Sequence, residues 1–141
     1  SNLSSMMRAF QYAIDHTSQI EHAGTVTAMG IAYASTGTDG PSAGAVMTVG
    51  FAALFKGDRL RRGIALTGTI TRDGTIGPVG GIPDKIRAAA REGYRTILIP
   101  EGQRHDPRWN IDRLAWDLNV EVKEVSRIEE AYHLMKGGSL E

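Results

Sequence analysis

Apolar side chains recur along the chain at spacings that predict helices and strands in alternation. Met6, Phe10 and Ile14 lie four residues apart, which places them on one face of an amphipathic helix. A stretch rich in β-branched and apolar residues follows, and then a run that is apolar on nearly every side and too long for a strand. The first half therefore predicts a helix over 3–20, a strand over 25–35, a turn over 36–41 and a buried helix over 42–55 that stops at Gly57-Asp58.

Turn and capping residues divide the second half into shorter elements. Asp73-Gly74 between two apolar stretches is a strong hairpin signal, and Ser126 with Glu129 forms an S-x-x-E capping box for a last helix. The expected elements are strands over 63–71 and 75–79, a helix over 83–92 with Gly93 at its end, a strand over 94–99, a loop over 101–109, a short helix through Leu118 capped by Asn110 or Asp112, a strand over 120–125, and a final helix with Ile128, Ala131, Tyr132 and Met135 on its inner face.

This order of elements predicts a mixed α/β fold of the α+β class, in which helices cover a sheet. The hairpin means that the sheet is not purely parallel. A length of 141 residues fits one domain with a single core, and the chain shows no internal repeat. We expect residues 1–141 to form that domain, with residues 137–141 as a tail or cloning remnant.

Composition excludes several functional classes. Sixteen basic and sixteen acidic residues cancel, so no net field favours nucleic acid or an anionic membrane. The chain has no Cys, which excludes disulfides and thiolate chemistry. No apolar run approaches the roughly 18 residues that span a bilayer, and no signal-peptide pattern opens the chain. We therefore expect a cytoplasmic location, no nucleic-acid partner and no membrane segment in this chain.

Ser42 stands in DGPSAG, where a tight turn leads directly into the buried helix. Unpaired backbone N–H groups at a helix start favour negative charge, so they would stabilise an alkoxide or the oxyanion of a tetrahedral intermediate. The small side chains of Ala43 and Gly44 would let a substrate backbone approach closely. The alternative is that Ser42 only caps the helix, which this segment taken alone favours.

Lys85 ends the glycine- and proline-rich run GPVGGIPDK and lies in the first turn of the expected helix. A cation there opposes the helix dipole, and burial beside Ile82 and Ile86 would further disfavour its charged form. A general base at neutral pH needs such an uncharged amine. The alternative is an exposed lysine paired with Asp84 or Asp73, which this segment taken alone favours.

Together and in this order, the two blocks resemble the Lon protease family, the S16 serine peptidases. The stretch DGPSAG is similar to the nucleophile motif of the family, and six matched residues around a serine are a specific signal. The matching blocks are DGPSAG at 39–44, LTGTI at 66–70, Gly74, GPVGGIPDK at 77–85, IRAAAREGYRTILIP at 86–100 and the closing VEVKEVSRIEEAYHLM. The resemblance extends over residues 25–136.

The resemblance implies a serine endopeptidase with a Ser-Lys dyad and an architecture like the second domain of ribosomal protein S5. Ser42 would attack the scissile carbonyl, and an uncharged Lys85 would take the hydroxyl proton and later deliver it to the leaving amine. Thr67 matches the family threonine that holds the lysine. Asp39 matches the aspartate of the nucleophile loop, where a structural role is as plausible as a catalytic one. The oxyanion and substrate-binding groups would come from Gly40, Pro41 and Ala43.

Some features depart from the family pattern or are missing. Thr69 replaces the glutamate of the family's TGEI sequence, and we expect the N-terminal hairpin of the family to be absent from this chain. No G-x-x-x-x-G-K-[ST] occurs, so we expect no cofactor in this chain, and ATP and Mg only if another part of the protein carries an ATPase. We expect no metal, because the histidines lack a motif and metal-ligand spacing; they are His16, His22, His105 and His133.

Partners and rival functions follow from the same resemblance. We expect unfolded or damaged polypeptides as substrates and self-association into a ring such as a hexamer. One alternative is a catalytically silent Lon-like domain used for assembly or binding, which would be expected to have lost both the nucleophile and the base. Another is phosphate binding by the GTDGPSAG loop, which has suitable glycines but lacks a lysine and a hydroxyl at its end.

Overall fold

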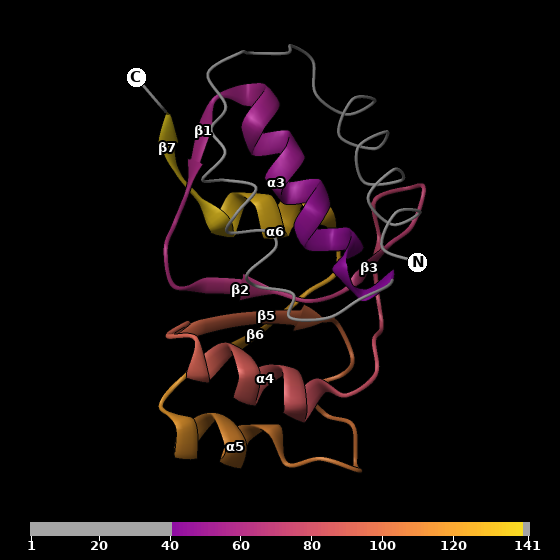
Figure 1. The fold of residues 1–141 in the computed structure, drawn as a ribbon. Helices are drawn as coiled ribbons and strands as arrows, with labels where there is room; N and C mark the ends of the chain where they lie inside the picture. Colours follow the sequence, from indigo (N-terminus) through magenta and orange to yellow (C-terminus); the bar gives the residue numbers. More distant parts are fainter. Residues whose placement is uncertain (1–40, 140–141) are drawn as a thin grey trace.

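A computed structural model describes residues 41–139 of the chain. The helix predicted over 3–20 and the strand predicted over 25–35 lie outside this range. The described elements are the 3-10 turn η1 (Pro41–Ala43), α3 (Gly44–Lys56), β1 (Asp58–Leu60), β2 (Ile64–Leu66), β3 (Thr69–Ile70), β4 (Ile76–Gly77), α4 (Ile82–Arg91), β5 (Thr96–Pro100), α5 (Ile111–Leu118), β6 (Glu121–Val125), α6 (Ile128–Met135) and β7 (Lys136–Ser139) (Figure 1).

A parallel three-stranded sheet in the order β2-β5-β6 separates two helical layers (Figure 1). Side chains alternate across a strand, and β5 supplies both layers. Leu98 belongs to the core formed with α3 and α6, whereas Ile97 and Ile99 belong to the core formed with α4 and α5. The antiparallel pairs β3-β4 and β1-β7 form two separate two-stranded sheets. The arrangement confirms the predicted α+β class.

The helix α3 is buried along most of its length, as its apolar sequence predicts. It ends at Gly57, whose left-handed backbone (φ 71°) is a conformation that glycine adopts without steric cost. At its start, Gly44 packs directly against β3, because a Cβ added there would lie 3.0 Å from Ile70 Cγ2. The missing side chain of Gly44 therefore lets α3 and β3 approach each other.

The strand predicted over 63–71 is two strands with different partners. β2 runs parallel to β5, whereas β3 runs antiparallel to β4, as the predicted hairpin requires. The change occurs at Gly68, whose N–H donates to Ser42 O (3.1 Å) and whose carbonyl accepts from Ala45 N–H (3.0 Å). Gly68 thus pairs with the start of α3 instead of with a sheet strand. A period-two pattern cannot reveal such a switch, because both halves are strand-like.

The start of α5 follows its predicted cap, since the Asn110 side chain accepts a hydrogen bond from Arg113 N–H (3.1 Å). The capping box predicted for α6 is wrong. Glu130 accepts the Ser126 N–H (2.9 Å) instead of Glu129, and Arg127 stands extended before the helix.

The physical reason for the late start of α6 is its contact with the hairpin. Ile76 N–H donates to Ser126 O (2.9 Å) and Ile128 N–H donates to Gly74 O (2.9 Å). Arg127, between these two bonds, forms an isolated antiparallel bridge with Thr75. The chain must stay extended to make these bonds, so the helix can begin only at Ile128.

Residues expected to form a C-terminal tail contribute a strand, because β7 pairs with β1. Asp58, on β1, is 7% exposed and accepts a hydrogen bond from the Tyr132 hydroxyl on α6. Burial, and then the adjacent Asp58, raise the pKa of Tyr132, so its hydroxyl remains a donor. Lys136 Nζ lies 3.8 Å from the same carboxylate.

Replacing Tyr132 by phenylalanine is expected to lower the free energy of unfolding by about 1–3 kcal/mol, because Asp58 loses a donor where little water reaches it. Urea denaturation measures the change. In an Asp58→Ala background the same replacement should cost much less. Equal costs in the two backgrounds would show that the hydroxyl acts elsewhere.

Candidate active site

Ser42 lies in η1, immediately before α3, and its side chain is partly exposed. The N-cap of α3 is Ala43, and that residue makes no side-chain cap bond. The structure therefore does not support the alternative that Ser42 is the cap of this helix. The backbone of Ser42 is fixed by the Gly68 N–H, which donates to Ser42 O at 3.1 Å.

The small residues that follow Ser42 are packed against other parts of the protein. The Ala43 side chain is completely buried with Met47 and Phe51, so only the backbone of Ala43 could meet a substrate. Gly44 lies against β3. The Ala45 N–H, one of the free donors expected at the helix start, is bonded to Gly68 O (3.0 Å) and is not available to an anion. Asp39 and Gly40, with the rest of the nucleophile loop before Pro41, lie outside the described residues.

Lys85 is the fourth residue of α4, and its amine folds back over the start of that helix. Its N–H donates to Gly81 O (3.0 Å), and its Nζ donates to Gly80 O (2.8 Å). The carboxylates offered as alternative partners are engaged elsewhere among residues 41–139. Asp84 pairs with Arg87 (3.0 Å), and Asp73 accepts from Thr71 and Thr75. The alternative of an ion pair between Lys85 and either aspartate is therefore not observed among residues 41–139.

Two adjacent residues, Thr67 and Gly68, lie between the segment that contains Ser42 and the hairpin that leads to Lys85. Thr67 is 7% exposed, and its N–H donates to Leu98 O (3.0 Å) at the end of β2. The next residue, Gly68, binds Ser42 and leads into β3. β3 pairs with β4, which leads into the loop before α4, the helix that carries Lys85.

The blocks recognised in the sequence are therefore attached to the two strands of one hairpin. Ser42 is held where β3 begins, and the loop before Lys85 leaves from the end of β4, with Thr69 opposite Gly77 in the pairing. In Figure 1, α3 and α4 both begin on the side of the molecule where this hairpin lies.

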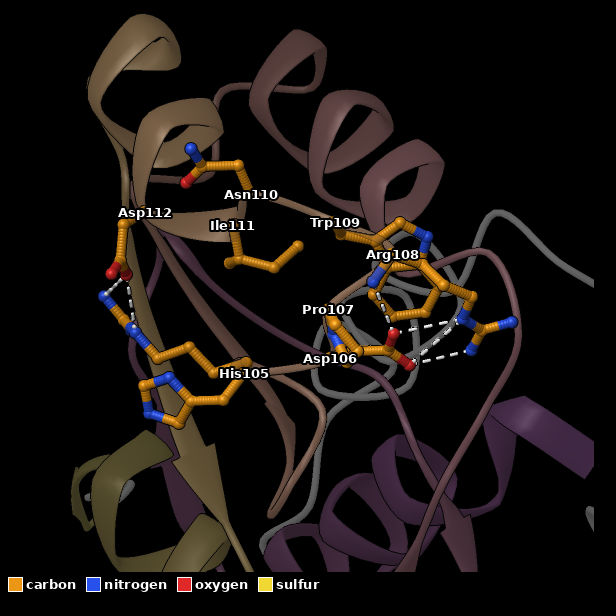
Figure 2. A pocket seen from close by; sticks show the side chains of 9 residues that line it. His105, Asp106, Pro107, Arg108, Trp109, Asn110, Ile111 and Asp112 are labelled. Carbon is orange, nitrogen blue, oxygen red and sulfur yellow. Dashed lines mark hydrogen bonds and ion pairs between the residues drawn. The ribbon is translucent and has the colours of Figure 1, made fainter.

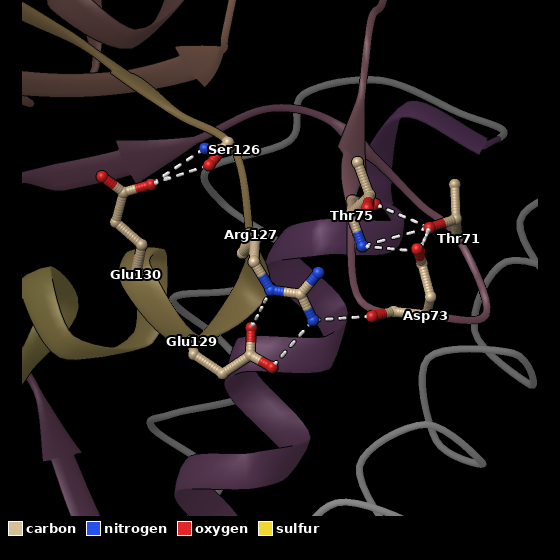
Figure 3. A network of polar contacts seen from close by, with 7 residues as sticks. All are labelled: Thr71, Asp73, Thr75, Ser126, Arg127, Glu129 and Glu130. Carbon is tan, nitrogen blue, oxygen red and sulfur yellow. Dashed lines mark hydrogen bonds and ion pairs between the residues drawn. The ribbon is translucent and has the colours of Figure 1, made fainter.

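A polar network ties the hairpin turn to the start of α6 (Figure 3). The Arg127 guanidinium donates to Asp73 O (2.7 Å) and pairs with Glu129 (3.3 Å). The Thr71 hydroxyl, followed by Thr75, lowers the pKa of the Asp73 carboxyl through hydrogen bonds. These contacts, with the backbone bonds around Ile76, anchor the hairpin that carries the lysine loop.

An open hollow lies in the loop between β5 and α5 (Figure 2). Its charged side chains are paired with each other, since Arg108 forms a 2.8 Å ion pair with Asp106 and Arg104 a 2.8 Å ion pair with Asp112. Arg108 also stacks over the Trp109 ring at 4.8 Å and lowers the pKa of Asp106 to about 2 through hydrogen bonds. These ion pairs leave few charged groups in the hollow with which an anion or a cation could bind.

One residue of that loop, Gln103, contacts the loop that precedes the helix of Lys85. No sequence pattern predicted this contact. Gln103 bonds both backbone polar groups of Val79 through its side-chain amide. It stands in a polar loop without periodicity or motif, so only the folded structure identifies it.

The described part of the chain offers neither a cluster of metal ligands nor a helix suited to crossing a membrane. Residues 41–139 contain no group of three His, Asp or Glu side chains that could hold a metal ion. None of the helices in the same range combines the length and apolarity that crossing a bilayer requires. His105 and His133 are exposed, whereas His16 and His22 lie outside this range.

Comparisons with known proteins match nearly the whole chain to one family. The family model described as the Lon protease (S16) C-terminal proteolytic domain matches residues 2–135. Lon protease 2 of Syntrophobacter fumaroxidans is 42% identical over 95 residues, which are 67% of this chain and 12% of that protein. Lon protease of Escherichia coli (strain K12) is 38% identical over 100 residues, 71% of this chain and 12% of that protein. The peroxisomal Lon protease homolog 2 of Mus musculus is 47% identical over 68 residues, 48% of this chain and 8% of that protein.

Proposed function

Because the chain belongs to the Lon protease (S16) family of peptidases, we propose that it hydrolyses peptide bonds of unfolded or damaged proteins with Ser42 as nucleophile and Lys85 as general base. The observation that carries the proposal is the shared hairpin. Gly68 holds the Ser42 backbone where β3 begins, and the paired strand β4 leads directly to the loop and helix of Lys85. The rival of a silent domain is weaker, because both reactive positions are filled.

In the proposed first step, the Ser42 hydroxyl adds to the scissile carbonyl carbon and its proton passes to Lys85 Nζ. The tetrahedral intermediate collapses when the C–N bond breaks, and the ammonium of Lys85 returns that proton to the leaving amine. Water then attacks the acyl-serine and passes a proton to Lys85. The ammonium returns that proton to Ser42 Oγ as the ester bond breaks and the carboxylic acid product leaves. The proton count balances over the two half-reactions, and no other base is needed.

The contacts of Lys85 support this role geometrically. An uncharged amine has two N–H donors and one lone pair, and a base must aim that lone pair at the hydroxyl. The Gly80 carbonyl takes one donor at 2.8 Å. We propose that the Thr67 hydroxyl takes the other, so that the lone pair is left for Ser42.

The oxyanion would be stabilised by backbone N–H groups around Gly40 to Ala43. The Ala45 N–H is excluded from this set by its bond to Gly68 O.

Self-association into a ring, and use of ATP and Mg by an ATPase in another part of the protein, are further proposals. The chain spans only 12% of the bacterial relatives that it matches.

Labelling with a serine-reactive fluorophosphonate tests the proposal directly. In a preparation that hydrolyses an unfolded protein, mass spectrometry should find the adduct on Ser42. The labelling rate should fall strongly in Lys85→Ala and remain unchanged in Lys123→Ala, which removes an exposed lysine of β6. An active preparation without an adduct on Ser42, or with equal labelling in Lys85→Ala, would overturn the proposal.

A further inference from the structure

The side chain of Gln103 pairs with the backbone of Val79 in the way that a neighbouring strand would. Val79 N–H donates to Gln103 Oε1 (3.0 Å), and Gln103 Nε2 donates to Val79 O (2.7 Å). Both bonds are partly buried, and both backbone polar groups of Val79 are thereby satisfied. Val79 lies in the loop between β4 and α4, two residues before the N-cap of the lysine helix.

The position of Gln103 is itself fixed by the sheet. Glu124 on β6 accepts hydrogen bonds through one oxygen from Gly102 N–H (2.8 Å) and Arg104 N–H (2.9 Å), the two residues that flank Gln103. Glu101 N–H donates to Val125 O (3.0 Å), which continues the attachment to β6. The amide of Gln103 is therefore held at a fixed place beside the loop and not on a freely moving segment.

The loop beyond Val79 has few other constraints. Gly80 and Gly81 are both exposed, and a Cβ added at Gly80 would meet nothing within 4 Å. Two consecutive glycines leave many backbone conformations open. The carbonyl that holds the Lys85 amine belongs to Gly80, the residue directly after Val79. Any rotation of the Val79 backbone would therefore move the acceptor that orients the amine.

From this chain of contacts we infer that Gln103 is a positioning residue for Lys85, acting through Val79 and the Gly80 carbonyl. Glu124 orients Gln103, Gln103 fixes Val79, and the carbonyl of Gly80 then sets the direction of the amine. The inference rests on the proposed function, since the direction of the amine matters to catalysis only if Lys85 is the base.

The substitution Gln103→Glu tests the inference with a side chain of equal size. A carboxylate still accepts from Val79 N–H but faces the Val79 carbonyl without a donor. We expect kcat at neutral pH to fall about tenfold to a hundredfold, as displacement of a reacting group does, with KM little changed. Glu101→Gln, the opposite exchange on an exposed residue of the same loop, is the matched control and should retain the original kcat.

The pH dependence separates positioning from a general loss of structure. A protonated carboxyl both donates and accepts, as the native amide does. The activity of Gln103→Glu relative to the original protein should therefore rise as pH falls toward about 4.3, the ordinary pKa of glutamate. Gln103→Ala should show no such recovery. In both variants the Val79 N–H should exchange with solvent faster than in the original protein.

The outcomes distinguish the inference from the function on which it rests. If Lys85→Ala keeps full activity, the proposed base is wrong, although fast exchange of Val79 would still show that Gln103 holds the loop. If Lys85→Ala is inactive but Gln103→Glu matches Glu101→Gln in kcat and pH profile, the positioning role is wrong. Recovery of Gln103→Glu at low pH, with none in Gln103→Ala, supports it.

Discussion

Replacing Ser42 by alanine is expected to lower the kcat for peptide hydrolysis by on the order of 10⁴- to 10⁶-fold, as loss of a nucleophile does in serine peptidases. Lys85→Ala should cause a loss of similar size, because the serine hydroxyl then has no base to take its proton. The double variant should be hardly slower than either single variant, since the two side chains act as one unit. Release of a fluorophore from a quenched peptide measures all three rates.

Controls for this experiment come from the same residue types elsewhere in the chain. Ser126→Ala and Lys123→Ala remove a hydroxyl that bonds Glu130 (3.5 Å) and an amine that pairs with Glu121 (3.9 Å), both on or beside β6. Both should keep the original rate. Full activity in Ser42→Ala or Lys85→Ala would exclude the dyad, and equal losses in the controls would point to damage to the fold instead.

Replacing Gly68 by alanine is expected to destabilise the protein by about 1–3 kcal/mol or more, in the range of overpacked cores. A Cβ at this position would overlap Ile76 Cγ2 and would also approach Ala45 Cβ (3.6 Å) and Pro100 Cγ (3.6 Å). Peptidase activity should fall together with stability, since Gly68 holds both the Ser42 carbonyl and the Ala45 N–H. Urea denaturation and peptide hydrolysis measure the two effects.

A second substitution tests whether the overlap is the cause. Gly68→Ala combined with Ile76→Ala removes the overlapping Cγ2, so it should be less destabilised than the sum of the two single variants predicts. Gly80→Ala is the control for adding a methyl group to glycine, because nothing lies within 4 Å of the added carbon, and it should have little effect on stability. Strictly additive costs in the double variant would contradict a steric role for Gly68.

Local sequence signals predicted most elements that depend on nearby residues. The apolar run of α3, the Asn110 cap of α5 and the Asp73-Gly74 hairpin turn follow from side chains within a few positions. Each of these features uses a contact that is short-range in sequence. The inner face predicted for α6 is also confirmed, with Ile128, Ala131 and Met135 buried.

Features that depend on distant partners were not visible in the sequence. The division of the strand at Gly68 depends on the start of α3, and the late beginning of α6 depends on the hairpin around Gly74. β1 and β7 are short, and each needs the other as a partner. The amide of Gln103 reaches Val79 across 24 positions of sequence. Periodicity carries no information about such pairings.

The candidate site shows the same division between local and distant information. The motifs around Ser42 and Lys85 predicted the two reactive residues, but neither segment alone favoured catalysis over a capping or ion-pair role. The structure assigns the cap of α3 to Ala43 and pairs Asp84 with Arg87. Neither observation matches the cap or the ion pair that was the simpler alternative for its segment.

A crystal structure of the protein with a peptide boronate bound would test the dyad most directly. The proposed mechanism predicts a covalent bond between boron and Ser42 Oγ, with Lys85 Nζ about 2.6–3.2 Å from that oxygen. It also predicts that the bond from Nζ to the Gly80 carbonyl persists. Boron attached to a different residue, or an amine of Lys85 directed into solvent away from Ser42, would contradict the proposed mechanism.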